Sequence, residues 1–361
     1  MCAENKTATV HDIARLAGTS ATTVSRVLSD NGYPVRESLR MKVLDAAREL
    51  NYAPNLIAKS LKQNMSCEIG VIVPTITNPF YSQAVLGIED EAYKQNYNLL
   101  LCCTLRNVNR ENIYLRMMLE KQVKGIIFSS VGDNLLLVNE FVKQGISFVL
   151  LDQRLPNDKC SHIGFDVFAG AVMGTKHLIE CGHTKIAFAS TPLNRWTRKK
   201  MYQGYKQAME KAGLETGPKY LLIVEDEIET EKESYEVNAG RLMAEKFIQT
   251  NLDATAVIMV NDMMAFGFIQ ELNKNSIRVP EDVSVMGFDD IPFASLFSPS
   301  LTTVCYPSFE TGKLAAKVLF EKMNNETDVV LNVRLEPNLI IRESVKQLHS
   351  NSENSAYQEL S

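Results

Sequence analysis

From about residue 68 onward, the chain alternates short apolar runs with longer amphipathic stretches. The runs have the length of strands, and the stretches between them repeat apolar positions at helical spacing. Strands are predicted at residues 68–75, 97–103, 125–130, 147–152, 162–166, 185–190, 220–224, 254–260 and 283–288, and helices at 83–95, 111–121, 169–180, 202–212, 238–249 and 263–273. This alternation predicts an α/β fold of parallel sheets covered by helices, with ligand positions at the carboxyl ends of strands.

The length of this α/β region predicts two lobes. About 280 residues, from 68 to 345, exceed what one hydrophobic core comfortably organises. A cleft between two lobes is a natural site for a small molecule. A single aspartate at a strand end is more often a helix cap than a ligand, whereas several that converge on one cleft favour binding. The candidate ligand contacts at strand ends are Asn78, Phe80, Tyr81, Asp152, Asp166, Arg195, Trp196, Thr197, Asn261 and Asp289.

The first 52 residues follow a purely helical pattern. Thr9 and Asp12 have the spacing of a capping box, and Gly18 can end the following helix with a positive φ. Ser20 can cap a second helix, in which Val24, Val27 and Leu28 face inward and Ala21, Thr22, Ser25, Arg26 and Ser29 face outward. A third helix is predicted at about 37–50. The pattern is that of a helix-turn-helix, which lays its second helix in the DNA major groove, although on pattern alone another three-helix mini-domain is possible.

The distribution of charge changes what the net charge indicates. The 361 residues carry 38 Lys and Arg against 43 Asp and Glu, a net charge of −5, which by itself argues against a nucleic-acid partner. Residues 1–62 hold nine bases and six acids, which leaves 29 bases and 37 acids for the rest of the chain. A basic head on an acidic body is the asymmetry associated with nucleic-acid contact.

Several classes of protein are disfavoured by the remaining composition. The apolar runs are far shorter than the ~18 residues that span a bilayer, and residues 1–20 hold no apolar core of a secretory signal. The seven cysteines form no C-x-x-C pair, which is typical of reduced thiols in a cytoplasmic protein. The five histidines form no metal-binding pair, and no nucleophile or phosphate-loop motif is present. We therefore expect no enzymatic activity, no cofactor, no metal and no membrane contact.

The order of residues in the head is more specific than its composition. Residues 9–28 read TVHDIARLAGTSATTVSRVL and closely resemble the N-terminal segment of the lactose-repressor/galactose-repressor (LacI/GalR) family of transcriptional regulators. Only Thr19 departs from the family pattern, which usually has valine there. The resemblance continues through residues 50–62, LNYAPNLIAKSLK, and more loosely to about residue 345.

The resemblance implies a domain organisation. It consists of a helix-turn-helix domain at 1–52, a hinge helix and linker at 53–67, and a periplasmic-binding-protein-like domain at 68–345 for effector binding and dimerisation. We place the first lobe at about 68–165 and 297–326, and the second at about 166–296 and 327–345. The polar tail 346–361 is expected to be disordered. It lacks the leucine heptads of a tetramer-forming tail, so a homodimer is predicted.

The resemblance also implies contacts with double-stranded operator DNA. Arg26 is the candidate donor to base edges, with Thr22 and Ala21 tuning the sequence read, and Thr9, Ser20, Ser25 and Tyr52 nearer the phosphates. In the hinge, the candidate contacts are Asn55, Ala58, Leu61 and Lys62. A helix of about eight residues is too short to persist alone in water, so it should form only against a partner. In the family the matching leucine, here Leu61, wedges between base pairs and kinks the duplex. Without the head, this segment would be interpreted as a plain linker.

Two departures from the family leave the effector open. The family has an effector-binding arginine three residues before a glycine, where this chain has Met201 before Gly204. Arg195 and Trp196 are candidates to replace it, by charge-assisted hydrogen bonds and ring stacking. Alternatively, the basic run at 195–200 meets an acidic protein surface, as in family members regulated by a phosphorylated carrier protein. The acidic segment 225–231 replaces a shorter loop that often carries an aromatic residue in relatives.

These features together predict a cytoplasmic transcription regulator. We expect a repressor of carbohydrate-utilisation genes whose operator affinity is controlled by a sugar or sugar derivative between the lobes. One alternative is a regulator controlled by a protein partner. Another is a solute-binding protein, which the body alone resembles but which the DNA-binding head disfavours.

The hinge hypothesis predicts the behaviour of Leu61→Ala. Without its apolar wedge the hinge cannot kink the operator, so tight operator binding should be lost while the dimer and the affinity for ligand are retained. Gel shifts, analytical ultracentrifugation and ligand titration measure these three properties. Unchanged operator affinity in the variant would contradict the wedge.

Overall fold

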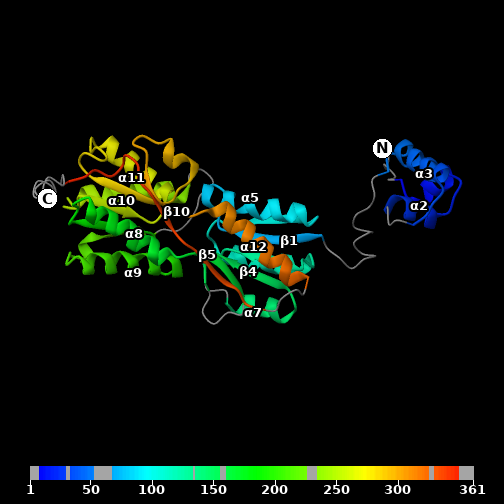
Figure 1. Ribbon diagram of the computed structural model, residues 1–361, viewed down its shortest axis with the longest axis horizontal. Helices are drawn as coiled ribbons and strands as arrows, with labels where there is room; N and C mark the ends of the chain where they lie inside the picture. Colours follow the sequence, from blue (N-terminus) through cyan, green and yellow to red (C-terminus); the bar gives the residue numbers. More distant parts are fainter. Residues whose placement is uncertain are drawn as a thin grey trace, which may run out of the picture. The chain divides into compact units, whose positions relative to one another are not determined.

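The computed structural model describes residues 8–29, 33–52, 67–132, 135–154, 160–225, 234–324 and 329–348. The chain divides into two compact units, Met1–Ser66 and Cys67–Ser361. This division falls beside the predicted start of the α/β region at residue 68. The two units are described separately below (Figure 1).

The first unit is the predicted three-helix head, with α1 (Val10–Leu16), α2 (Ala21–Ser29) and α3 (Glu37–Glu49). Asp12 N donates to Thr9 Oγ1 at 3.3 Å and Thr9 N donates to Asp12 Oδ2 at 3.0 Å, which completes the capping box. Gly18 has φ +64°, and Thr23 N donates to Ser20 Oγ at 3.1 Å at the start of α2. The three helices share one small core, formed by Ile13, Ala14, Ala17, Val24, Val27, Val43, Ala46 and Ala47.

The second unit holds two six-stranded sheets, which define two lobes. The first sheet has the order β11-β5-β4-β3-β1-β2 and is parallel throughout. Its strands are β1 (Glu68–Val73), β2 (Asn98–Cys103), β3 (Gly125–Phe128), β4 (Ser147–Leu151), β5 (Ser161–Phe165) and β11 (Asn332–Leu335). Its helices are α5 (Pro79–Lys94), α6 (Val108–Glu120), α7 (Leu135–Lys143) and α12 (Ser308–Met323).

Both faces of the first sheet are buried under helices, as a parallel sheet requires. On one face Ile126 and Phe128 pack with Leu115 of α6 and Phe141 of α7. On the other face, the intervening Ile127 belongs to the core that includes residues of α5 and α12, among them Ile88 and Leu319. Successive residues of β3 therefore serve opposite cores, which explains why the strand reads as a continuous apolar run.

The second sheet has the order β12-β10-β9-β8-β6-β7. It is parallel except for β12, which runs antiparallel to β10. Its strands are β6 (Ile186–Ser190), β7 (Leu221–Ile223), β8 (Ala256–Met259), β9 (Ser284–Asp289), β10 (Thr302–Cys305) and β12 (Asn338–Ile340). Helices α8 (Val167–Glu180) and α9 (Trp196–Lys211) lie on one side of it, and α10 (Tyr235–Gln249) and α11 (Asp262–Lys274) on the other (Figure 1). Short 3-10 helices η1 (Pro218–Tyr220) and η2 (Pro292–Ser295) complete the lobe.

The chain passes between the lobes at three places: from β5 to α8, from β10 to α12, and from β11 to β12. Two segments consequently lie in the other lobe from the one predicted. Residues 302–305, placed in the first lobe with 297–326, form β10 beside β9 of the second sheet. Residues 332–335, placed in the second lobe with 327–345, form β11 beside β5 of the first sheet. The apolar pattern identifies a strand but not its neighbour, because the pairing partner is set by tertiary packing.

The predicted tail also begins too early in the sequence. Lys346 N donates to Ser284 Oγ at 3.1 Å, and Leu348 N donates to Cys181 O at 2.8 Å. Residues 346–348 are therefore part of the second lobe, and the rest of the predicted tail, 349–361, lies outside the described residues. The predicted hinge at 53–66 and most of the acidic segment, 226–231, also lie outside them.

Three helix pairs pack at glycines. A Cβ at Gly312 of α12 would lie 1.9 Å from Ala84 O of α5, and one at Gly87 of α5 would lie 2.0 Å from Phe309 O of α12. The same close approach occurs between α10 and α11 at Gly240 and Gly267, and between α8 and α9 at Gly204. Since helix axes can approach this closely only where no side chain intervenes, each pair is held as a rigid layer on its sheet.

Candidate functional site

The outward face of α2 is the candidate nucleic-acid surface. Val24 and Val27 are buried in the three-helix core, so Thr22, Ser25 and Arg26 are exposed on the opposite side, and Ala21 is partly exposed. The Arg26 guanidinium lies 4.0 Å from the ring centre of Tyr33, a cation–π contact that supports the side chain while leaving it at the surface.

The other predicted DNA contacts divide into three groups. Thr9 and Ser20 cap α1 and α2, where helix amides are suited to bind a phosphate. Tyr52 is half-buried and packs against the core of the head. The hinge candidates Asn55, Ala58, Leu61 and Lys62 lie outside the described residues.

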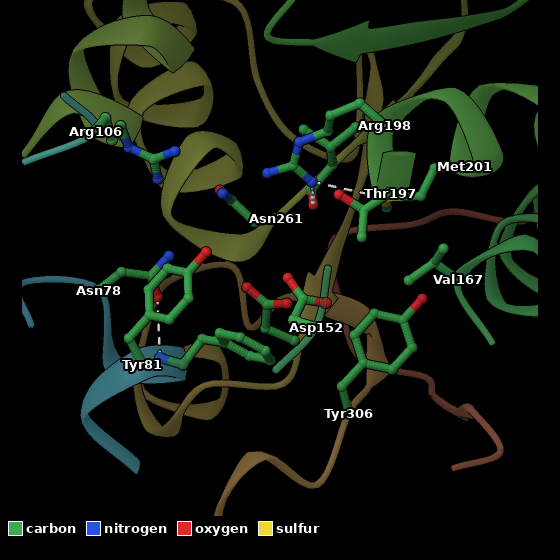
Figure 2. Close-up of a pocket in the computed structure, with 13 residues that line it drawn as sticks. Asn78, Tyr81, Arg106, Asp152, Val167, Thr197, Arg198, Met201, Asn261 and Tyr306 are labelled. Carbon is green, nitrogen blue, oxygen red and sulfur yellow. Dashed lines mark hydrogen bonds between the residues drawn. The ribbon is translucent and has the colours of Figure 1, made fainter. Parts of the chain in front are cut away.

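A pocket lies between the two lobes of the second unit, where the carboxyl ends of both sheets converge. It contains about 420 Å³ of space, including its opening to solvent. The residues that line it are Asn78, Phe80, Tyr81, Arg106, Asp152, Val167, Thr197, Arg198, Met201, Val260, Asn261, Asp289 and Tyr306 (Figure 2). Each of them lies at the end of a strand, in the loop after a strand or in the first two turns of the helix that follows it, so the strand-end rule for α/β proteins accounts for the position of the pocket.

Seven of the residues predicted as ligand contacts line this pocket: Asn78, Phe80, Tyr81, Asp152, Thr197, Asn261 and Asp289. Asn78 and Asn261 also cap α5 and α11, because their side-chain oxygens accept from Phe80 N and Met264 N. These two residues therefore both cap a helix and line the pocket.

Three predicted contacts do not line it. Asp166 caps α8 by accepting from Ala169 N at 2.9 Å. Arg195 is buried beside the pocket, where its Nη2 donates to Ser130 O at 3.5 Å. Trp196 lines a neighbouring hollow, with the Arg154 guanidinium 5.4 Å from its ring centre.

Sequence reasoning missed Arg106, Val167, Arg198, Met201, Val260 and Tyr306 as pocket residues. The most informative of these is Arg198. The predicted helix began at residue 202, whereas α9 begins at Trp196. Residue 198 is therefore helical and lies about one turn before Met201, on the same face of α9. Arg198 therefore brings a guanidinium to the pocket from the turn before Met201.

The backbone is unusual around the pocket. Among the described residues, ten other than glycine have positive φ, and five of these directly follow helix C-caps: Asn51, Asn96, Gln122, Asn251 and Ser276. The others are Leu105, Arg106, Asp152, Asp289 and Asp290, all at strand ends next to the cleft. Such conformations cost on the order of 1 kcal/mol or more and are retained where the surroundings enforce them, which is typical of binding sites.

Burial dominates the electrostatics of the pocket carboxyls. It raises the pKa of Asp152, an effect that the nearby Arg195 and Arg198 partly oppose. Burial also raises the pKa of Asp289 well above its usual value, and the neighbouring Asp262 carboxyl adds to the increase. A ligand that donates hydrogen bonds to these two carboxyl groups would stabilise their ionised form.

Direct contacts hold the two lobes together around the pocket. Arg106 of the first lobe forms a buried ion pair with Glu236 of the second, and Asn78 Nδ2 donates to Glu236 Oε1 at 3.3 Å. Gln153 Nε2 donates to Thr197 Oγ1 at 3.0 Å across the same cleft. Burial alone would raise the pKa of Glu236, but Arg106 and the hydrogen bonds lower it below its usual 4.5. Glu236 is therefore ionised at neutral pH.

Within the part of the chain that the structure describes, no group of His, Cys, Asp or Glu side chains could hold a metal ion. No helix in that part is long and apolar enough to cross a membrane.

Two family models each match one part of the chain, and known relatives match nearly all of it. Residues 9–55 match the model described as bacterial regulatory proteins, lacI family, and residues 175–345 match that of a periplasmic binding protein-like domain. The chain is 34% identical over 342 residues to the HTH-type transcriptional repressor PurR of Aliivibrio salmonicida, covering 94% of this chain and 100% of that protein. It is 35% identical over 347 residues to PurR of Haemophilus influenzae strain PittEE, covering 94% and 99%.

Solved structures resemble the fold over similar lengths. A LacI family transcriptional regulator from Enterococcus faecium with bound ribose is 30% identical, with a TM-score of 0.70, covering 78% of this chain and 100% of that one. The transcriptional regulator CelR in complex with cellobiose is 25% identical, with a TM-score of 0.70, covering 93% and 99%. The lac repressor dimer bound to operator and the anti-inducer ONPF is 24% identical, with a TM-score of 0.81, covering 94% and 100%.

For the buried ion pair between the lobes, we expect replacement of one partner to destabilise the protein more than replacement of both. Arg106→Met leaves Glu236 buried without its cation, which should lower the free energy of unfolding by about 3–5 kcal/mol in urea titrations. The double variant Arg106→Met/Glu236→Met should be more stable than Arg106→Met alone. Because the pKa of Glu236 is lowered, the stabilisation by the pair is complete above pH 4.5 and is lost as the pH falls through the folded-state pKa.

The exposed pair Lys176–Glu180 provides the matched control. Lys176→Met should change stability by less than about 1 kcal/mol, as solvent-exposed pairs do. If Arg106→Met were no more destabilising than Lys176→Met, the ion pair would not hold the lobes.

Proposed function

The chain belongs to the lacI family of bacterial regulatory proteins, and from that premise we propose that it is a repressor whose affinity for operator DNA is set by a small molecule bound between its lobes. It is a DNA-binding transcription regulator and not an enzyme. The observation that carries the proposal is the pairing of an exposed α2 face in one unit with a strand-end pocket in the other.

The proposed DNA contact places α2 in the major groove. Arg26 donates to base edges, Thr22 and Ala21 tune the sequence read, and Ser25 contacts a phosphate. The capped starts of α1 and α2, at Thr9 and Ser20, contact the backbone with Tyr52. In the hinge, Leu61 enters the minor groove, with Asn55, Ala58 and Lys62 beside it.

A homodimer brings two such heads to the half-sites of a palindrome. The edge strand β2 and the adjacent α5 offer a face for the second copy. Leu86 and Tyr93, seven residues apart on α5, are 52% and 77% exposed, and Leu101 of β2 is 38% exposed. Large apolar side chains exposed beside a sheet edge are typical of a surface that a partner covers.

For the effector we propose a sugar or sugar derivative, which makes the target genes those of carbohydrate utilisation. Asp152, Asn261 and Asp289 present the oxygens that accept from hydroxyl groups, and Phe80 and Tyr81 supply aromatic faces. The E. faecium regulator and CelR were solved with ribose and cellobiose respectively.

The alternative of a protein partner at the basic run 195–200 is less favoured. Arg195 and Arg198 are only 6% and 9% exposed, so half of the arginine and lysine side chains of that run are turned inward.

The proposed coupling between ligand binding and DNA binding runs through the two lobes. A ligand that changes the angle between them changes the spacing of two marginal hinge helices, at the usual coupling of ~1–3 kcal/mol.

The DNA contact is tested by Arg26→Ala in gel shifts with the DNA upstream of the protein's own gene. Loss of a base-edge donor should weaken specific binding by about 10- to 100-fold, with little change for non-specific DNA. Arg48→Ala removes the same charge from an exposed position on α3 and is the control. Equal weakening by both variants would show that only net charge matters and would contradict the base contact.

The effector pocket is tested by thermal unfolding in the presence of sugars, sugar phosphates and nucleobases. A compound that binds the folded state raises the unfolding temperature, and Asp289→Ala should remove that shift. Glu245→Ala removes an exposed carboxylate of α10 and should leave it unchanged. If no compound stabilises a protein that binds its operator, the small-molecule proposal fails and control by a protein partner is favoured.

A further inference from the structure

Three buried guanidinium groups lie in or beside the cleft. Arg106, Arg195 and Arg198 are 9%, 6% and 9% exposed. Among the described residues, Arg106 has an ion-pair partner, Glu236, whereas neither Arg195 nor Arg198 has a carboxylate within ion-pair distance. Neither guanidinium is therefore in direct contact with a protein carboxylate in this part of the molecule, although Asp152 lies near both and Asp289 lies near Arg198.

Arg198 is the one of these two that lines the pocket. Its Nη1 donates to Val260 O at 3.1 Å and lies 3.6 Å from Met201 Sδ, both uncharged acceptors. Its Nε is buried and has no hydrogen-bond partner. Figure 2 shows the guanidinium held at one side of the pocket by these contacts, near Asn261.

A buried charge without a counter-ion is costly, and removing it from water is compensated only by a partner of opposite charge. A planar guanidinium matches the two oxygens of a carboxylate or phosphate, and such charge-assisted pairs are about twice as strong as neutral hydrogen bonds. The nearby positive charge of Arg195 further favours an anion, because it opposes the charge on Arg198.

The opposite side of the pocket has a different chemistry. Figure 2 shows Asp152 there, and Asp289 also lines the pocket; both carboxyl groups can accept hydrogen bonds from neutral donors such as hydroxyls. An oxyanion placed against these carboxyls would be repelled. A ligand with an anionic group at one end and hydroxyl groups at the other can therefore bind in one orientation only.

We propose that the effector is a polyhydroxylated molecule with an oxyanion, a sugar phosphate or sugar acid, whose anionic group binds Arg198 while its hydroxyls bind Asp152 and Asp289. This rests on the proposed function, since it narrows the ligand of the same pocket. Arg198 then determines specificity. It rejects the neutral sugar, which would leave the buried guanidinium without a counter-ion.

The test uses thermal unfolding of the full chain with matched pairs of probes. Ribose is compared with ribose 5-phosphate, and glucose with glucose 6-phosphate and gluconate. In the parent, at least one anionic probe should raise the unfolding temperature more than its neutral partner does. In Arg198→Gln, the affinity for that probe, from titration calorimetry, should fall by about 10- to 100-fold. A response to the phosphates alone or to gluconate alone identifies which oxyanion is bound.

Lys199→Gln is the matched control, because it removes one positive charge from the next position of α9, which is exposed. It should bind the anionic probe as the parent does. The proposal is overturned if no anionic probe stabilises the parent, if neutral sugars stabilise it equally, or if Arg198→Gln retains full affinity. Gel shifts on the same samples, with and without the probe, separate this failure from that of the proposed function, because a protein that still binds its operator retains the proposed DNA contact whichever probe it binds.

Discussion

The convergence of the carboxyl ends of two parallel sheets on one space determines the chemistry of the second unit. Each strand must turn there toward a helix on the face of its sheet, and the turn exposes polar caps and bent backbone to the cleft. Asn78 and Asn261 illustrate the caps, and Asp152 and Asp289, with φ of 63° and 110°, illustrate the backbone. The geometry of the sheets thus creates a polar pocket before any ligand is considered.

Charge then couples the two lobes. Arg106 and Glu236 belong to different lobes and are both buried, so opening the cleft separates a cation from its anion unless water enters to solvate them. Asn78 takes part in the same contact and also caps α5, which links the first helix of one lobe to the first turn of α10 in the other. Opening the cleft therefore costs the free energy of separating this buried pair, which makes the closed cleft a distinct arrangement.

The sequence predicts those parts of the molecule that depend on local rules. The capping box of Thr9 and Asp12 and the strand-end residues Asn78, Asp152, Asn261 and Asp289 follow from short-range spacing, and the structure places the latter four around one pocket. What it cannot predict depends on tertiary packing. The assignment of β10 and β11 to sheets depends on pairing between distant segments, and Tyr306 reaches the pocket only because β10 does. Arg198 was missed because the start of α9 lacks a capping side chain that would mark it.

The three crossings of the chain between the lobes determine the order in which its parts can fold during synthesis on the ribosome. The first lobe is built from residues 68–165 together with α12 and β11, so it stays incomplete until residue 335 has emerged. Until then the surface of α5 around Gly87, which α12 covers, is exposed on the nascent chain. The head has its own core and can fold early in synthesis. A chain that has just left the ribosome tunnel can thus already carry a folded three-helix head, while the pocket between the lobes is among the last features to form.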